Sequence, residues 1–340
     1  MRVALDAMGG DHAPGPIVAG ARQAVEDSPE LTVVLVGDQA RIEAELGPDA
    51  PRDRLPIVHA SQCIGMDEKP VEALRKKRDN SISRCWGLMA SGDVNAVVSA
   101  GHTGAMVASA LFNAKMFLPG VRRPGIAAFY PSHQGPIVII DVGANMNAKA
   151  EDLYQYGIMG AIYAEEILGV TEPKIGLLNV GAEEEKGTDL TRGTRDLYQS
   201  STWAGRFLGN VEGRDLHEGH ARVIICDGFV GNVLLKSGEG AVEFLFATLK
   251  QELARLMPDL PGDAGPKMAT ALKGLKARFE YEEFGGGPLL GIKGACIICH
   301  GSSGSRAIRN ALKIAGTMAS ERLSARIVEH LAALPSARSD

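Results

Sequence analysis

Short runs of apolar residues alternate along the chain with longer stretches in which apolar positions recur every three or four residues. The short runs have the length of strands and end close to glycine, asparagine or aspartate. We predict strands at residues 3–7, 31–37, 56–60, 96–100, 137–142, 174–180, 223–227 and 296–300. Helical spacing fills the intervening segments, including residues 16–26, 103–115 and 152–168. This alternation predicts an α/β fold with a mostly parallel sheet covered by helices.

One region departs from the alternation. Residues 230–283 have the spacing of two long helices, interrupted at residues 258–266, with no strand between them. Apolar residues form one stripe along both helices: Leu249, Leu253, Leu256, Leu260, Met268, Leu272, Leu275 and Phe279. The stripe is flanked by Lys267, Lys273, Lys276 and Arg278. We therefore predict an amphipathic helical hairpin, inserted before the last strand of one α/β catalytic domain that spans residues 1–340.

Composition narrows the classes of function. The chain has 340 residues, of which 45% are hydrophobic and only 5% aromatic, so a large aliphatic core is expected. A net charge of −5 argues against a protein that neutralises nucleic-acid phosphates over a broad surface. No run of 18 apolar residues is present, and the N-terminus lacks the pattern of a secretory signal. We expect a cytoplasmic protein.

Several kinds of site are not expected from the sequence. The patterns G-x-x-x-x-G-K-[ST], G-x-G-x-x-G and G-x-S-x-G are absent. Five cysteines are scattered, and the pair Cys296 and Cys299 lies within an apolar run, so we interpret them as buried thiols. His217 and His220 lie in a polar stretch without a third ligand nearby and are interpreted as a surface loop.

Glycine-rich turns that follow predicted strands and precede helices form a candidate anion site. Glycine lets the backbone approach a ligand closely, and a helix start presents unpaired N–H groups to negative charge. The candidate phosphate or substrate ligands are Gly9, Gly10, Asp11, His12, Gly101, His102, Thr103, Gly104, His300, Ser302 and Ser303. Thr103 is expected at an N-cap, and Arg306 and Arg309 add positive charge. Ordinary capped helices would have the same pattern.

Further polar residues follow the other predicted strands. The candidate catalytic residues are Asn145, Asn179, Lys186, Asp227 and Asn232, and Asp6 and Asp141 are additional polar candidates. Lys186 can pair with phosphate or with a developing oxyanion, although a loop lysine is often only solvated. Because ligands of parallel sheets bind beyond the carboxyl ends of the strands, and the motifs largely fall at those ends, we expect them to point at one cleft.

Seven blocks of the sequence carry a resemblance to a known family. They are MRVALDAMGGDHAP at 1–14, SAGHTGA at 99–105, DVGAN at 141–145, LLNVGAEEEKG at 177–187, DGFVGNV at 227–233, FGGGPLLGIKG at 284–294 and HGSSG at 300–304. In this order they resemble the bacterial phosphate acyltransferases of phospholipid synthesis, the PlsX family. The chain departs from the family at His102, where asparagine is more usual; both side chains offer a neutral donor and acceptor.

The resemblance implies a fold and an activity. The fold would be that of the isocitrate and isopropylmalate dehydrogenases and the phosphotransacetylases. The activity would be transfer of a fatty acyl group from acyl-carrier protein to inorganic phosphate, giving acyl phosphate for phospholipid synthesis. The family further implies a homodimer without metal or nucleotide cofactor, associated peripherally with the inner face of the cell membrane. A glycerol-3-phosphate acyltransferase would then act downstream.

Two surface regions are candidates for the contacts that this activity requires. Acyl-carrier proteins are acidic, and Arg75, Lys76, Lys77 and Arg78 form a basic run that is predicted to dock them, with a second basic pair at Arg122 and Arg123. Leu256, Met257 and Leu260 at the hairpin tip are predicted to contact the membrane, or else the partner subunit. The alternative functions are a dehydrogenase of the same fold and a non-enzymatic, membrane-associated scaffold for carrier protein.

Overall fold

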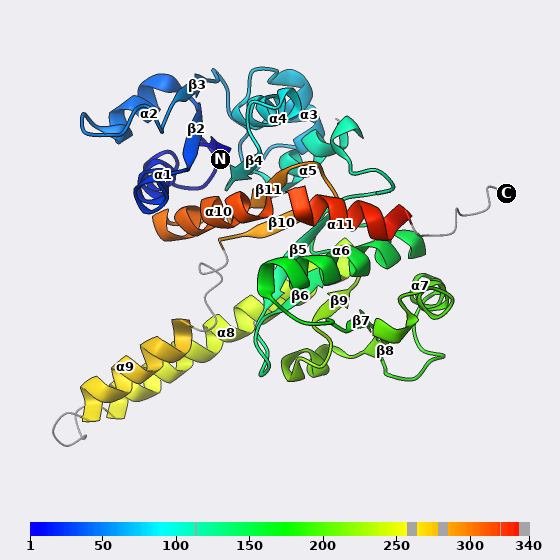
Figure 1. The fold of residues 1–340 in the computed structure, drawn as a ribbon. Coiled ribbons are helices and arrows are strands. Elements are labelled where there is room, and N and C mark those ends of the chain that lie inside the picture. The colour runs from blue at the N-terminus through cyan, green and yellow to red at the C-terminus, as the bar shows by residue number, and fades with distance from the viewer. Residues whose placement is uncertain (113, 257–263, 278–284, 320, 333–340) are drawn as a thin grey trace.

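The apolar runs pair in the computed structural model into one continuous sheet of eleven strands, in the order β3-β2-β1-β4-β11-β10-β5-β6-β9-β7-β8 (Figure 1). The structure describes residues 1–112, 114–256, 264–277, 285–319 and 321–332. The strands are β1 (Arg2–Asp6), β2 (Thr32–Gly37), β3 (Ile57–His59), β4 (Ala96–Ser99), β5 (Gly125–Tyr130), β6 (Ile137–Ile140), β7 (Ile175–Leu178), β8 (Phe207–Val211), β9 (Val223–Ile225), β10 (Gly287–Leu290) and β11 (Ala295–Ile298).

Helices cover both faces of the sheet. They are α1 (Gly15–Asp27), α2 (Gln39–Leu46), α3 (Pro70–Lys76), α4 (Ser81–Ser91), α5 (Thr103–Phe112), α6 (Ala150–Leu168), α7 (Asp189–Gln199), α8 (Gly228–Leu256), α9 (Ala264–Ala277), α10 (Ser305–Met318) and α11 (Glu321–Ala332). Alternate residues of a strand join different cores: Val3 and Leu5 pack with α1 and α10, whereas Ala4 packs with α4. Burial on both faces explains why most strands read as continuous apolar runs.

The predicted α/β fold is confirmed, and three strands were missed. The eight predicted strands are present, each with ends within two residues of the prediction. The missed strands are β5, β8 and β10. β8 contains Gly209 at φ +90°, and β10 begins with Gly287 and Pro288, all residues that strands disfavour. The hairpin is therefore followed by two strands, β10 and β11, and the prediction that it precedes only the last strand is wrong.

The direction of the strands changes in the middle of the sheet. β10 is antiparallel to both β11 and β5, and β5 is antiparallel to β6. The group β1, β2, β3, β4 and β11 is parallel within itself, as is the group β6, β7, β8 and β9. The two groups consequently run in opposite directions. The carboxyl ends of the first group therefore lie along one edge of the sheet, and those of the second group lie along the opposite edge.

The predicted helical hairpin is present in the described residues as α8 and α9, which extend away from the sheet in Figure 1. α8 has 29 residues, a length of about 44 Å at 1.5 Å per residue. Leu249, Leu253 and Leu272 of the predicted stripe are half-buried, whereas Leu256, Met268 and Leu275 are exposed. The stripe residues Leu260 and Phe279, and the predicted membrane contact Met257, lie outside the described residues.

Candidate active site

Three of the predicted glycine turns meet at one end of the strands. They follow β1, β4 and β11, and we call them together the first strand-end site (residues 7–14, 100–104 and 299–304). The N–H of Asp11 donates to the carbonyl of Gly301 at 2.8 Å. Gly10 has φ +115°, and a Cβ there would lie 3.2 Å from the same carbonyl oxygen. A Cβ on Gly9 would lie 2.5 Å from the amide nitrogen of Gly101, so only glycine permits this approach.

Helix starts surround these turns. α1, α5 and α10 are the helices that follow β1, β4 and β11, and no described side chain caps α1 or α10. At α5 the carbonyl of His102 accepts from the N–H of Met106 at 3.0 Å, so His102 occupies the N-cap position. The prediction of Thr103 as the N-cap is wrong by one residue. Uncapped helix starts present unpaired N–H groups and the positive ends of helix dipoles, which favour an anion.

The side chains of this site are partly engaged with each other. His300 Nδ1 lies 2.7 Å from Ser302 Oγ, and the N–H of Ser303 donates to the carbonyl of His300 at 3.0 Å. His102 Nε2 lies 3.0 Å from the carbonyl oxygen of Glu68. Asp11, His12, Thr103, His300 and Ser302 are exposed, so a ligand can reach them.

The other predicted residues lie at the opposite end of the strands. DVGAN, DGFVGNV and LLNVGAEEEKG follow β6, β9 and β7, which run against β1, β4 and β11. The prediction of one cleft for all blocks is therefore wrong for a single chain. Hydrophobic periodicity identifies a strand but not its direction, and the antiparallel neighbours β5 and β10 reverse the second half of the sheet.

Asp141 and Asn145 form a closed network at this second strand-end site, which consists of residues 141–145 and 226–232. The Asp141 carboxylate accepts from the N–H groups of Ile126 at 3.1 Å and Asn145 at 2.6 Å, among others. Asn145 Nδ2 donates to the carbonyl of Pro124 at 2.6 Å and to Tyr156 Oη at 2.7 Å. Burial raises the pKa of Asp141, and the backbone donors oppose that shift. The contacts of both side chains shape the loop.

Asp227 and Asn232 begin the long helix α8. Asp227 Oδ1 accepts from the N–H groups of Phe229 at 2.9 Å and Val230 at 3.1 Å, the contacts of an N-cap. Asn232 is exposed one turn later. A Cβ on Gly228 would lie 2.8 Å from Asp141 Oδ2, so α8 starts directly against the loop of Asp141. Tyr156, which the sequence prediction missed, supports this loop through its hydrogen bond with Asn145.

Asn179 and Lys186 belong to the loop after β7. Asn179 Nδ2 donates to the backbone carbonyl of Lys186 at 3.1 Å, which closes the loop. The side chain of Lys186 is exposed. A carbon added at Gly187 would lie 2.6 Å from Asn179 Nδ2, so the loop also needs a glycine there.

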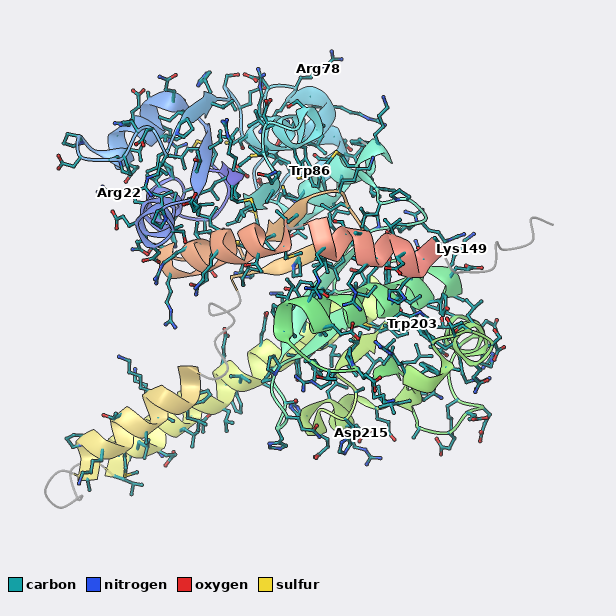
Figure 2. The ribbon with its side chains drawn as sticks, in the orientation of Figure 1. Arg22, Arg78, Trp86, Lys149, Trp203 and Asp215 are labelled. Atoms are coloured by element: carbon teal, nitrogen blue, oxygen red, sulfur yellow. The ribbon has the colours of Figure 1, made fainter. Side chains whose placement is uncertain are left out.

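The basic candidates differ in their contacts. Lys77 pairs with Glu68 and donates to the carbonyl of Cys63 at 2.9 Å, and its hydrogen bond lowers the pKa of Glu68. Lys77 therefore holds the loop before α3. Arg75, Lys76 and Arg78 are exposed, and Arg78 projects outward in Figure 2.

The two residues of the second basic pair, Arg122 and Arg123, also differ in their contacts. Arg122 Nε lies 3.2 Å from Asp152 Oδ1 at the start of α6, so this side chain has a structural partner. Arg123 is exposed. Among the described residues, no group of three His, Cys, Asp or Glu side chains is placed to hold a metal ion.

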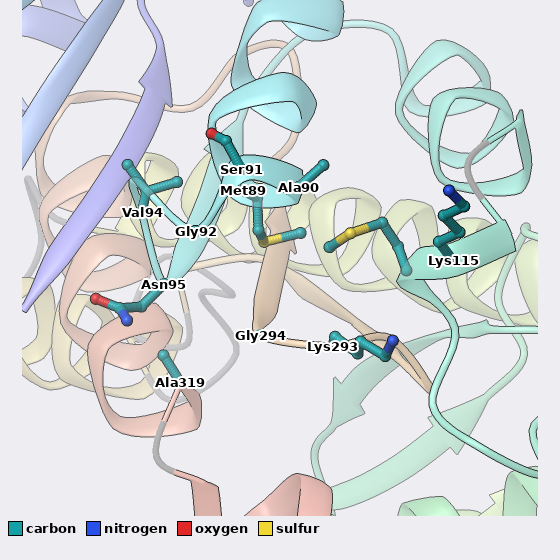
Figure 3. Close-up of a pocket in the computed structure, with 11 residues that line it drawn as sticks. Met89, Ala90, Ser91, Gly92, Val94, Asn95, Lys115, Lys293, Gly294 and Ala319 are labelled. Carbon is teal, nitrogen blue, oxygen red and sulfur yellow. The ribbon is translucent and has the colours of Figure 1, made fainter.

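A cavity of about 740 Å³ opens between the end of α4 and the starts of β4 and β11 (Figure 3). Met89, Met116, Lys115 and Lys293 contribute to its lining. It lies at the opposite ends of β4 and β11 from the first strand-end site, and none of the predicted site residues lines it.

Comparison with known proteins identifies the family. A family model described as "Fatty acid synthesis protein" matches residues 1–326. A phosphate acyltransferase of Desulforamulus reducens is 46% identical over 331 residues, which cover 97% of each chain. One of Heliobacterium modesticaldum is 46% identical over 334 residues, covering 97% of this chain and 98% of the relative. This chain belongs to the phosphate acyltransferase family. It is therefore an acyltransferase of fatty acid and phospholipid synthesis, as the resemblance implied.

Solved structures of related fold support the architecture. A phosphotransacetylase from Streptococcus pyogenes has a TM-score of 0.61 at 15% identity, covering 94% of each chain. A branched-chain phosphotransacylase from Enterococcus faecalis has a TM-score of 0.56 at 15% identity, covering 94% of this chain and 99% of the phosphotransacylase. At this identity the likeness concerns the fold alone. No described helix of this chain is long and apolar enough to cross a membrane.

Proposed function

We propose that this chain transfers a fatty acyl group from the thioester of acyl-carrier protein to inorganic phosphate, with phosphate bound at the first strand-end site. One observation carries the location. The starts of α1, α5 and α10 converge on glycine turns that touch each other, through Gly9 with Gly101 and Gly10 with Gly301. Backbone N–H groups and helix dipoles at such starts favour a dianion.

The reaction does not require a nucleophile from the protein. A phosphate oxygen attacks the thioester carbonyl, a tetrahedral oxyanion forms, and the carbon–sulfur bond then breaks. The acyl group is now bonded to phosphate, and the carrier thiolate, which is the leaving group, takes up a proton. Phosphate is already a nucleophile at neutral pH, so the protein must mainly orient it and stabilise the oxyanion. We propose His102, His300, Ser302 and Ser303 as the side chains that supplement the backbone donors.

Carrier docking is proposed at the exposed part of the basic run. Arg75, Lys76 and Arg78 present positive charge on and after α3, whose start lies against α5: a Cβ on Gly104 would lie 2.8 Å from Pro70 Cγ. The helix that leads to the basic run therefore starts beside one turn of the proposed phosphate site, which supports docking there. Charge reversal at Arg75 and Arg78 is expected to raise the Michaelis constant for carrier, with an effect that shrinks at high salt.

Peripheral association with the inner membrane surface is proposed for the hairpin. The exposed apolar residues Leu256, Met268 and Leu275 occur with neighbouring lysines, a combination that lies in a bilayer interface without spanning it. We retain a homodimer and a glycerol-3-phosphate acyltransferase that consumes the product as parts of the same proposal. A cytoplasmic location follows from these partners.

The activity is tested by following free carrier thiol. Purified protein and acylated carrier are incubated with and without inorganic phosphate. We expect thiol release only with phosphate, together with a hydroxylamine-reactive acyl phosphate in equal amount. Equal release without phosphate would identify a thioesterase instead, and carrier binding without release would identify a scaffold. Reduction of a nicotinamide cofactor would favour the dehydrogenase alternative.

A further inference from the structure

A buried carboxylate lies directly behind the first strand-end site. Asp6 is the last residue of β1 and is only 1% exposed. Its neighbour in the sheet, Ser99, is the last residue of β4 and is fully buried. Both precede turns of the proposed phosphate site, and neither side chain reaches its exposed surface.

Hydrogen bonds connect this carboxylate to both turns. Ser99 Oγ donates to Asp6 Oδ2 at 2.7 Å, and the N–H of Gly101 donates to Ser99 Oγ at 3.0 Å. The N–H of Met8 donates to Asp6 Oδ1 at 3.2 Å. A continuous chain of contacts therefore runs from the turn after β1, through Asp6 and Ser99, to the turn after β4.

The two turns also rest on the carboxylate sterically. A Cβ on Gly9 would lie 2.6 Å from Asp6 Oδ2, and one on Gly101 would lie 3.0 Å from the same oxygen. Both glycines thus pack against one carboxylate oxygen, which limits how close the turns can come to each other. Close packing transmits a change at such a position to the surrounding backbone.

The same bonds decide which amides remain for a ligand. The N–H of Gly101 is engaged by Ser99 Oγ and is not available to phosphate. The N–H groups of Thr103 and Gly104 belong to the first turn of α5, where the helix itself provides no acceptor. The Asp6–Ser99 link therefore orients the start of α5 while Gly101 serves as a spacer.

We propose that Asp6 and Ser99 are positioning residues for phosphate: through Gly9 and Gly101 they hold the turns after β1 and β4 at the separation that aims the first N–H groups of α5 at the anion. This inference rests on the proposed phosphate site. Neither residue touches the substrate. Burial and hydrogen bonding hold the carboxylate in one orientation, as positioning of the turns requires.

The test compares two buried serines in the full-length protein. Ser99→Ala removes the link to Gly101, whereas Ser109→Ala in α5 removes a buried hydroxyl that has no partner among the described contacts. Steady-state kinetics with varied phosphate and varied acyl carrier gives both Michaelis constants and kcat. We expect Ser99→Ala to raise the Michaelis constant for phosphate about tenfold and to change that for carrier less than about twofold, because misplaced donors weaken one substrate only. Ser109→Ala should change neither.

Two further variants separate the outcomes. Asp6→Asn keeps the shape of the side chain and should give a smaller rise than Ser99→Ala; it also replaces Ser99→Ala if that variant does not fold. Ser302→Asp introduces a negative charge at the site itself and should raise the Michaelis constant for phosphate whatever Asp6 does. An effect of Ser302→Asp with none of Ser99→Ala or Asp6→Asn would overturn the positioning role alone. If no variant changes the Michaelis constant for phosphate, the phosphate site is overturned. If the Michaelis constants for phosphate and for carrier rise equally, Asp6 and Ser99 have a merely structural role.

Discussion

Asp227 accepts hydrogen bonds from the N–H groups of Phe229 and Val230, and these contacts give it a defined structural task at the start of α8. A carboxylate after a strand and before a helix fits an active site and an N-cap equally well in the sequence. The same holds for Asn145, whose side-chain amide donates hydrogen bonds to the carbonyl of Pro124 and to Tyr156 Oη. The glycines at positions 9, 101 and 231 were recognisable, but their neighbours were not, because contacts between distant turns have no local sequence pattern.

Removal of the Asp227 cap is expected to affect stability first. Asp227→Ala should lower the free energy of unfolding by about 1 kcal/mol, the usual contribution of an N-cap. Asn232→Ala, one turn further into the exposed surface of α8, should leave it nearly unchanged. Urea unfolding of both variants measures the difference. Loss of turnover by Asp227→Ala without any loss of stability would instead support its predicted catalytic role.

At the scale of elements, strands and helices with regular patterns were predictable, and irregular ones were not. β1 and β11 are continuous apolar runs because both of their faces are buried. β8 has a half-exposed burial pattern and a shifted register against β7, so it has no clear alternation. The hairpin was predictable because helical spacing persists across residues that make few contacts with the sheet.

α11 is attached to α6 by ion pairs, and this attachment should depend on pH. Arg326 lies 2.6 Å from Glu165 and 2.5 Å from Glu166, and Arg206 lies 2.5 Å from Glu165. Burial raises the pKa of Glu165, but hydrogen bonds from Arg206 and Arg326 outweigh it and lower the pKa below the ordinary 4.5. A lowered pKa in the folded state contributes stability above the unfolded value, and this contribution disappears as the pH falls through the folded value.

Arg326→Met should therefore destabilise the protein at pH 7 and progressively less below about pH 4.5. Free energies of unfolding measured in urea between pH 7 and pH 3 give the difference from the wild type. Arg322→Met, which removes a more exposed partner of Glu166 alone, should have a smaller effect. A difference that stays constant across this range would contradict the assigned ion pairs.

The hairpin prediction concerns the exposed part of the stripe. Leu256→Glu combined with Leu275→Glu should abolish binding to vesicles that contain anionic lipid, because two charges enter the apolar face. Gln251→Glu, at an exposed position of α8, is the matched control. Vesicle sedimentation measures lipid binding, and the mass of the protein in solution gives its oligomeric state. A wild type that never binds vesicles, with a double variant that becomes monomeric, would identify a subunit interface instead.

At the scale of the whole molecule, the reversal of the sheet decides which predicted residues act together. β5 and β10 place the blocks after β1, β4 and β11 at one end of the strands and those after β6, β7 and β9 at the other. The seven blocks identified the family from sequence, but they contain no information on strand direction. We therefore propose phosphate at the first strand-end site and not at Lys186.

A crystal structure with bound inorganic phosphate tests this assignment most directly. We predict phosphate oxygens within about 2.7–3.2 Å of backbone N–H groups from at least two of the turns after β1, β4 and β11. The same crystals of Lys186→Ala should retain the phosphate in that place. Phosphate bound beside Lys186 or in the cavity of Lys115 and Lys293, with the first strand-end site empty, would contradict the account.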